Sequence, residues 1–277
     1  MSKTYLEKMF SLEGQVVAIT GGGGVLGGAL AVGLSQAGAK IAVLNRTQKK
    51  ADRIVNEIKK IKGTAMAFSA DVLDKKNMEN AIQSIIKEFG MVDVLINCAG
   101  GNQPTATASD QLRFMDIPQE PMQAVLNINF LGTFIPCQVF AQFFSEKKVG
   151  HIINISSMAA LRPLTKVVAY SAAKSAVNNF TQWLAVHLSQ NYSSSIRVNA
   201  IAPGFFLTEQ NRFLLTDEKS GELTARGKTI IAHTPLARFG EAEELVSTAL
   251  WLLSPASRFV HGTVIPVDGG FSAFSGV

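Results

Sequence analysis

The stretch Thr20-Gly-Gly-Gly-Gly-Val-Leu-Gly-Gly28 decides the fold through the two patterns that flank it. The apolar run over residues 15–20 predicts a buried β-strand, and the apolar spacing over residues 25–36 predicts a helix that ends before Gly38. Glycines let a backbone approach a diphosphate closely, and a helix N-terminus offers unpaired N–H groups. Because a strand precedes the turn and a helix follows it, the stretch predicts a dinucleotide site rather than a plain turn. No Lys-Ser or Lys-Thr follows the glycines, which argues against a P-loop nucleotidase.

Outward from this turn, strand and helix patterns alternate along the rest of the chain. Strands are predicted over residues 40–45, 65–70, 92–97, 151–156, 196–201 and 263–267, and helices over 47–61, 74–89, 122–147, 167–190 and 241–253. Repeated strand–helix units with short connections predict an α/β Rossmann fold, a doubly wound seven-stranded parallel sheet with helices on both faces. No Pro/Ser-rich linker or charge block divides the chain, so we expect residues 1–277 to form a single dinucleotide-binding and catalytic domain.

Two long segments, 101–121 and 204–235, interrupt this alternation with mixed Pro, Gly, Asn and Phe residues. Long connections after the carboxyl ends of parallel strands lie over the crevice in which open α/β sheets bind ligands. We therefore expect both segments to contribute to substrate binding, with 204–235 acting as a substrate loop or lid.

The composition excludes several classes of protein. Hydrophobic residues make up 47% of the chain and charged residues 17%, which provides apolar surface for a core and rules out disorder. The net charge of +5 comes from basic residues scattered along helices, so we expect no nucleic acid partner. No uncharged apolar stretch approaches about 18 residues and the N-terminus lacks a signal pattern, so we expect no membrane association and a cytoplasmic location. Two cysteines and four distant histidines predict neither a disulfide framework nor a metal site.

The end of the predicted strand 40–45 bears on the choice of cofactor. Dinucleotide folds selective for NAD usually carry an acid there, which accepts from the 2′-hydroxyl of the ribose, whereas an Arg suits a 2′-phosphate. This chain has Asn45 followed by Arg46, and no acid. The pattern favours NADP(H) over NAD(H), and a solvated Arg46 in a turn is the alternative.

A second set of residues points to proton chemistry. Tyr170 and Lys174 are four residues apart near the start of a predicted helix, so they share one face, and Ser157 follows the predicted strand 151–156. A phenol with a pKa of about 10 is a poor base at neutral pH, and a neighbouring ammonium is expected to lower that pKa.

Together with the glycine turn, this set resembles the short-chain dehydrogenase/reductase family over nearly the whole chain. The resemblance also rests on Asn97-Cys-Ala-Gly100, Asp71-Val72, Asn129 and Pro203-Gly204. It implies an oxidoreductase that uses a nicotinamide cofactor on CH–OH groups.

The resemblance also implies roles for individual residues. Tyr170 would be the general acid or base, Lys174 would lower its pKa and hold the nicotinamide ribose, and Ser157 would donate to the substrate oxygen. Asn129 would anchor a proton-relay water. Asp71 has a second interpretation as a helix N-cap, and Val25 stands where the family's turn usually has a glycine. The implied cofactor-binding residues are Gly21, Gly23, Gly24, Val25, Leu26, Asn45, Arg46, Asp71, Val72, Asn97, Ala99, Gly100, Tyr170, Lys174, Pro203, Gly204, Phe206 and Thr208.

The unusual parts of the sequence resemble a branch of the family that reversibly reduces D-fructuronate to D-mannonate. These parts are the four-glycine turn, Ala99-Gly-Gly-Asn102, and the stretches 202–212 and 267–271. A sugar-acid carboxylate needs a cation or several N–H donors once it leaves water. The candidates for that task are Asn102, Arg162, Lys166, Asn211 and Arg212. The alternatives are another sugar, polyol or keto-gluconate reductase of the gluconate 5-dehydrogenase kind and, more remotely, a catalytically silent dinucleotide-binding sensor.

Apolar side chains also bear on assembly. Aromatic residues recur in the predicted helices 122–147 and 167–190, and the tail Phe271-Ser-Ala-Phe274 is apolar. These residues suit a core, but the family resemblance implies helices that pair between subunits, so we expect a homotetramer.

Overall fold

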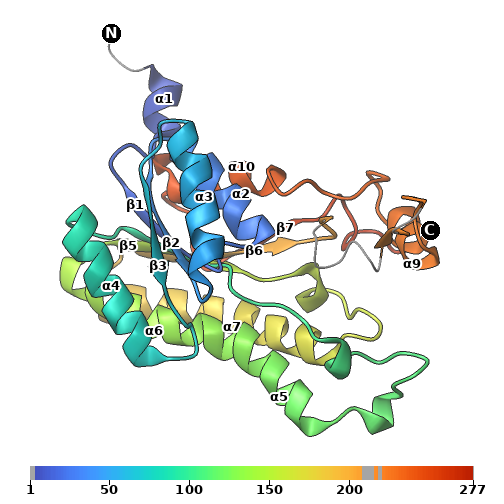
Figure 1. Ribbon diagram of the computed structural model, residues 1–277. Coiled ribbons are helices and arrows are strands. Elements are labelled where there is room, and N and C mark those ends of the chain that lie inside the picture. The colour runs from blue at the N-terminus through green and yellow to red at the C-terminus, as the bar shows by residue number, and fades with distance from the viewer. Residues whose placement is uncertain (1–3, 208–214, 218–219, 277) are drawn as a thin grey trace.

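Seven parallel strands form one sheet at the centre of the computed structural model, which describes residues 4–207, 215–217 and 220–276 (Figure 1). The order across the sheet is β3-β2-β1-β4-β5-β6-β7, so the chain runs outward from β1 to β3 and then returns to β4 beside β1. The crevice at the carboxyl ends of β1 and β4 is therefore the switch point at which such sheets bind ligands. The strands are β1 Val16–Thr20, β2 Lys40–Asn45, β3 Ala65–Ser69, β4 Val94–Asn97, β5 Gly150–Ile155, β6 Ile196–Pro203 and β7 Val264–Val267.

Helices cover both faces of the sheet. The face of the sheet that carries Val17 and Ile19 of β1 is covered by α2 Val25–Gln36, α3 Gln48–Lys60 and α10 Glu244–Leu253 (Figure 1). The opposite face, which carries Val16 and Ala18 of β1, is covered by α4 Lys75–Phe89, α6 Gly132–Lys147 and α7 Val168–Asn191. The inner strands are buried on both faces, which explains their continuous apolar runs. The predicted seven-stranded, doubly wound, single-domain fold is confirmed.

Three features of the structure differ from the sequence prediction. The short helix α1 Tyr5–Phe10 was not predicted, because none of its side chains is buried. A capping box between Thr4 and Glu7 stabilises its first turn. The predicted helix 122–147 is divided into α5 Gln119–Leu126, a π-helical turn Asn127–Leu131 and α6. The predicted loop 204–235 contains the helix α9 Ala225–Ala232.

The segment Gln119–Lys147 is long and apolar enough to cross a membrane by length and composition, which corrects the expectation that no such stretch exists. It contains uncharged polar residues as well as apolar ones, so a count of consecutive apolar residues overlooks it. In the structure, Cys137, Phe140 and Phe144 of α6 are buried in the core beneath the sheet. Its apolar character therefore serves packing between a helix and the sheet.

The opposite end of the sheet, at the amino ends of the strands, holds a partly buried histidine, His151. His151 on β5 pairs in register with Arg197 on β6, whose guanidinium donates to the carbonyl oxygens of Leu252, Ser257 and Val260. The Nδ1 atom of His151 is buried without a hydrogen-bond partner. Burial, reinforced by the charge of Arg197, lowers the pKa of His151 from 6.5 to about 4.

This histidine predicts a loss of stability in mild acid. In the unfolded chain the imidazole takes up a proton near pH 6.5, whereas in the folded chain it resists protonation until about pH 4. The free energy of unfolding should therefore fall as the pH drops from 6.5 to 4, by up to about 3 kcal/mol from this group. Urea titrations at stepwise pH measure the effect, and His151→Gln should flatten the dependence in that window. An unchanged slope in the variant would show that His151 is not the group responsible.

Candidate active site

A cavity of about 800 Å³ lies at the carboxyl ends of the central strands. The glycine turn after β1, the ends of β2 and β4, the start of α7 and the segment after β6 all contribute to its wall. Of the implied cofactor-binding residues, those that line it are Gly21, Gly24, Val25, Leu26, Asn45, Arg46, Asp71, Val72, Ala99, Gly100, Tyr170, Lys174, Pro203, Gly204 and Phe206. Thr208 lies outside the described residues.

The glycine turn forms a cradle into which a side chain would not fit. Gly21 has φ of +64°, and a Cβ atom there would lie 2.8 Å from the backbone of Ala99. A Cβ atom on Gly27 would lie 2.5 Å from the carbonyl oxygen of Gly21, and Gly24 is the N-cap of α2. The first residues of α2, Val25 to Gly27, also line the cavity, and a helix N-terminus at such a place suits a diphosphate. Gly23 instead packs against Lys50 of α3 and does not line the cavity.

The adenosine end of this cavity carries positive charge. Arg46 and Lys50 line it and are exposed, and β2 ends in Asn45, whose amide donates to the carbonyl of Thr47. Asp71 lines the same end, and its carboxylate accepts from the backbone of Leu73. The N-cap interpretation of Asp71 is wrong, since Asp74 caps α4.

At the other end of the cavity, Tyr170 and Lys174 of α7 meet Ser157. Lys174 is buried, its Nζ atom donates to the carbonyl of Ile155 at 2.8 Å, and this atom lies 5.7 Å from the centre of the Tyr170 ring. The Ser157 hydroxyl forms a hydrogen bond with the Tyr170 phenol and also accepts from the backbone of Ala159. The three residues expected to carry out proton chemistry therefore lie side by side in one wall of the cavity.

Burial controls the proton affinities at this end. It raises the pKa of Tyr170 above its usual value, and the hydrogen bond to Ser157 offsets part of that rise. Burial also lowers the pKa of Lys174 from 10.5 to about 8. The pKa of Tyr170 is thus raised and not lowered as expected, and the hydrogen bond to Ser157, rather than the Lys174 ammonium, is the contribution that opposes desolvation.

Asn129 occupies the π-helical turn between α5 and α6 and is fully buried. Its amide nitrogen donates to the carbonyls of Gly101 and Val125, at 2.7 and 2.8 Å, and its Oδ1 accepts from the backbone of Gly101. A Cβ atom on Gly100 would lie 2.7 Å from that Oδ1 and 3.4 Å from Lys174 Nζ. The Asn129 side chain therefore holds the turn after β4 against the lysine.

A polar stripe on α7 fixes the helix along β5. The side chains of residues 174, 178 and 181 lie on one face of α7. Each forms a hydrogen bond with one of the residues 154–156, at the end of β5 and just beyond it. The hydrogen bonds are Lys174 Nζ to Ile155 O at 2.8 Å, Ser156 Oγ to Asn178 Oδ1 at 2.5 Å, and Asn154 Nδ2 to Thr181 Oγ1 at 2.9 Å. Asn97 extends this network by donating to Asn154 and to the Cys137 sulfur, so its side chain lies beneath the cavity rather than in its lining.

Three of the predicted substrate residues, Asn102, Arg162 and Lys166, do not line the cavity. The Asn102 amide donates to Thr107, and Arg162 Nε donates to the carbonyl of Ser272 at 2.9 Å. Lys166 is exposed with φ of +75°. Asn211 and Arg212 fall outside the described residues. The expectation that Asn102, Arg162 and Lys166 reach the bound substrate directly is therefore not supported by their side-chain positions.

Sequence reasoning missed other residues that line the cavity. At the substrate end these are Gln103, Asn127, Met158, Leu164 and Phe205. Gln103 and Phe205 come from the two long segments, Met158 and Leu164 from the loop between Ser157 and Tyr170, and Asn127 from the start of the π-helical turn. No spacing in these stretches identifies an inward side chain. Cys98 also lines the cavity, and burial raises its thiol pKa to about 11, so the thiol is protonated and unreactive at neutral pH. Among the described residues, no group of three His, Cys, Asp or Glu side chains is arranged to hold a metal ion.

Comparison with known proteins identifies the family. Residues 15–219 match the short chain dehydrogenase family. This chain belongs to that family. Its members are oxidoreductases that act on CH–OH groups with NAD(P), and the enzyme class follows for this chain.

Three similar proteins extend the comparison. The uncharacterized oxidoreductase UxuB of Bacillus subtilis (strain 168) is 48% identical over 96% of this chain and 98% of its own length. A crystal structure with bound NAD, of a protein from Haemophilus influenza provisionally assigned as a D-mannonate oxidoreductase, has a TM-score of 0.90 at 44% identity, covering 98% of this chain and 100% of that one. A gluconate 5-dehydrogenase from Burkholderia cenocepacia J2315, in complex with NADP and tartrate, has a TM-score of 0.87 at 30% identity, covering 97% and 99% of the two chains.

The glycine cradle of this short-chain dehydrogenase predicts a matched pair of variants. Gly21→Ala places a Cβ atom against Ala99 at a positive φ, whereas Gly90→Ala has a similar φ of +81° with nothing within 4 Å. Both variants carry backbone strain, but only the first disturbs the turn at the cavity. We expect Gly21→Ala to weaken binding of the dinucleotide by at least about tenfold and Gly90→Ala to leave it unchanged. Quenching of tryptophan fluorescence by the dinucleotide measures both; equal affinities would show that the close approach is unimportant.

Proposed function

We propose that this enzyme reversibly reduces D-fructuronate to D-mannonate. The observation that carries the proposal is one cavity with the glycine cradle at one end and Ser157, Tyr170 and Lys174 at the other. Similarity to the provisionally assigned D-mannonate oxidoreductase supports the choice of sugar acid.

In the proposed mechanism, Tyr170 supplies the proton that the substrate oxygen takes up during reduction, and it removes that proton during oxidation. Ser157 already forms a hydrogen bond with the phenol, so a substrate oxygen placed between the two hydroxyls is bound by both. Lys174 holds its ammonium beside the ring through the Ile155 carbonyl. Since burial lowers its pKa to about 8, the charge that favours the phenolate is present at neutral pH and is lost in more alkaline solution.

Asn129 contributes by position in this proposal. Its three side-chain hydrogen bonds hold Gly101 and the turn after β4 in place beside Lys174. A relay water, which the family resemblance implies at this residue, would lie near that turn.

The residues of the cradle fit a nicotinamide dinucleotide. Gly21, Gly24 and the N-terminus of α2 would hold the diphosphate, and Lys174 would hold the nicotinamide ribose. When bound, the cofactor supplies the hydride in reduction and accepts it in oxidation. We infer a preference for NADP(H), because Arg46 and Lys50 line the adenosine end and the end of β2 has no acid.

A second candidate function is that of a gluconate 5-dehydrogenase or a related reductase of sugar acids. The similarity to the Burkholderia cenocepacia enzyme with NADP and tartrate favours it. Both candidates take a compact hydroxy acid, which suits a substrate end lined by Gln103 and Asn127 as well as by apolar side chains. A silent dinucleotide-binding sensor is the third candidate, and the assembled Ser157, Tyr170 and Lys174 argue against it.

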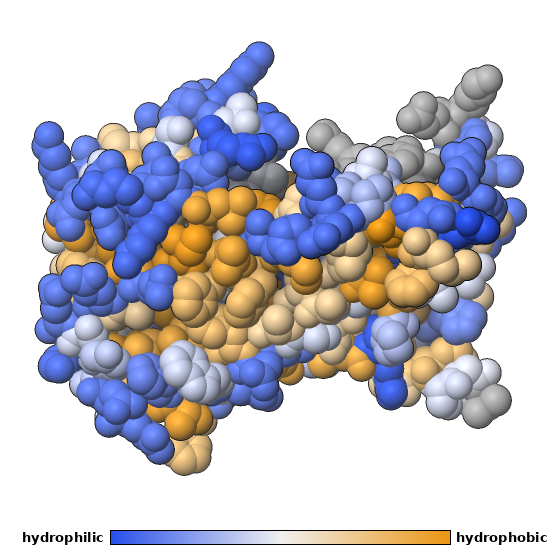
Figure 2. All heavy atoms as spheres, turned by 90° about the horizontal axis from the view of Figure 1, so that it is seen from below, coloured by the Kyte–Doolittle hydropathy of each residue, from blue (hydrophilic) through white to orange (hydrophobic). Residues whose placement is uncertain are grey.

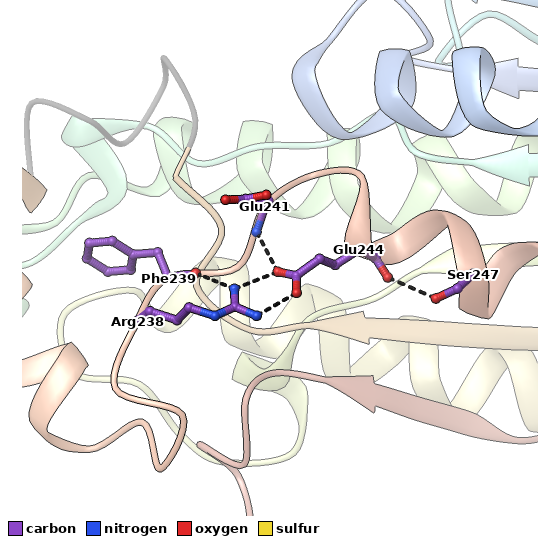
Figure 3. A network of polar contacts seen from close by, with 5 residues as sticks. All are labelled: Arg238, Phe239, Glu241, Glu244 and Ser247. Atoms are coloured by element: carbon purple, nitrogen blue, oxygen red, sulfur yellow. Dashed lines mark hydrogen bonds and ion pairs between the residues drawn. The ribbon is translucent and has the colours of Figure 1, made fainter.

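We also propose a cytoplasmic homotetramer with the segment 204–235 as the substrate lid. Apolar atoms gather on the face covered by α6 and α7 (Figure 2), where Trp183 and Val186 are each 55% exposed and Trp183 stacks between Phe180 and His187. Such a face suits contact with a second copy of the chain. A mass of four chains in light scattering would support this assembly, and a monomer would contradict it.

Removing the phenol hydroxyl should separate catalysis from binding. We expect Tyr170→Phe to reduce kcat by at least about a thousandfold while the dinucleotide binds as before, because the ring stays and only the proton donor is lost. Absorbance of the reduced cofactor at 340 nm reports turnover with keto-uronates, keto-gluconates and acetoacetyl thioesters. Highest kcat/KM for D-fructuronate in the wild-type protein would support the first candidate, and highest kcat/KM for 5-ketogluconate the second. No turnover of any substrate would favour the sensor.

The cofactor preference depends on Arg46. The wild-type enzyme should have a lower KM for NADPH than for NADH, and Arg46→Gln should raise the KM for NADPH by about tenfold with little effect on NADH. The loss is specific because the guanidinium would meet only the 2′-phosphate. Arg258→Gln is a matched control, since Arg258 is exposed and lies at the opposite end of the sheet, before β7. A wild-type preference for NADH would contradict the assignment.

A further inference from the structure

The chain after β7 folds into a compact turn rather than an extended tail. Both oxygens of the Asp268 carboxylate accept backbone N–H groups, from Gly270 and Ser272, each at 2.9 Å. Gly269 and Gly270 have φ of +63° and +87°, a conformation that side chains rarely adopt. The sequence Asp268-Gly-Gly therefore encodes the turn, and residues 268–274 are called the C-terminal brace below.

The brace contacts segments that are distant in sequence. Arg162 Nε donates to the Ser272 carbonyl at 2.9 Å, and the Phe271 ring packs edge to face on Phe205 with centroids 5.1 Å apart. A Cβ atom on Gly204 would lie 2.6 Å from the Cα atom of Asp268, so the two backbones touch. In Figure 1 the C-terminus lies beside α9, and the backbone N–H of Leu236, just after α9, donates to the Gly269 carbonyl.

Two of these segments are walls of the substrate end of the cavity. Phe205 lines it from the segment after β6, and Leu164 lines it from the loop between Ser157 and Tyr170. Arg162 precedes Leu164 by two residues, so the bond to Ser272 ties the Leu164 wall to the brace. Because the brace also touches Gly204 and Phe205, it fixes one wall relative to the other.

We propose that the C-terminal brace holds these two walls in register, so that Arg162 and Phe271 are positioning residues that set the affinity for the sugar acid. This inference rests on the proposed function in one respect, namely that the substrate end takes a sugar acid. Arg162 itself does not line the cavity, which argues that it acts through the brace and not by touching the carboxylate. The charge-assisted bond and the aromatic pair act on the same turn, so their effects should not be independent.

A double-mutant cycle tests the brace. We expect Arg162→Gln and Phe271→Ala each to raise the KM for the sugar acid by about tenfold, with the KM for the cofactor changed by less than about twofold. The KM of the double variant for the sugar acid should exceed that of the worse single variant by no more than about twofold, because either change alone already releases the two walls. Arg162→Lys keeps a donor for the Ser272 carbonyl and should recover much of the affinity, whereas Arg258→Gln should leave every constant unchanged.

The outcomes separate the brace from the proposed function. An unchanged KM in both single variants would overturn the brace and leave the reaction intact. A large effect of Arg162→Gln with none from Phe271→Ala would also overturn it, in favour of direct contact between Arg162 and the carboxylate. If the wild-type enzyme turned over no sugar acid, the proposed function would fail, and hydrogen exchange would still decide on the brace. Faster exchange in residues 158–167 of both variants supports it, and unchanged exchange there refutes it.

Discussion

The position of α7 along β5 is the constraint on which the rest of the site depends. Tyr170 and Lys174 come from the helix and Ser157 from the chain just beyond the strand, so a sliding helix would separate them. Apolar packing alone has little directional preference along the helix axis, whereas the three hydrogen bonds to residues 154–156 are satisfied in one register. Each of these groups is buried or partly buried, so a slip would leave polar atoms without partners, at a cost of about 1 to 3 kcal/mol each. Lys174 is thus also one of the three anchors of its own helix.

The sheet could be predicted because its strands are buried on both faces, and continuous apolar runs between glycine turns leave few other interpretations. The elements that were missed carry no such signal. The helix α1 buries none of its side chains, and the π-helical turn Asn127–Leu131 keeps the apolar pattern of the helices on either side. That turn inserts Asn129 into the core near Lys174, so the irregularity between α5 and α6 places a buried polar side chain at the cavity.

The two ends of the site differ in how far sequence could predict them. The cofactor end is built from local patterns, a glycine turn and the last residues of strands, whose spacing is visible in the chain. The substrate end depends on long-range partners: Arg162 turns to a carbonyl 110 residues away, and Phe205 is covered by Phe271. A cationic side chain between Ser157 and Tyr170 predicts a carboxylate ligand by proximity alone. Only the three-dimensional structure reveals that a backbone oxygen from the far end of the chain already holds that side chain.

The charges around the cavity explain why positioning of walls matters at the substrate end. Among the described residues that line it, the cations are Arg46 and Lys50 at the adenosine end and Lys174 at the reacting end. Lys174 already donates one N–H to the Ile155 carbonyl and, in the proposed function, also holds the nicotinamide ribose, so little of its donor capacity is left for a substrate carboxylate. Recognition of an anionic substrate by the described lining must therefore rely on several neutral donors acting together, such as the Gln103 and Asn127 amides. Neutral donors contribute individually less than an ion pair and depend more on distance and angle, so affinity becomes sensitive to how firmly the surrounding loops are held.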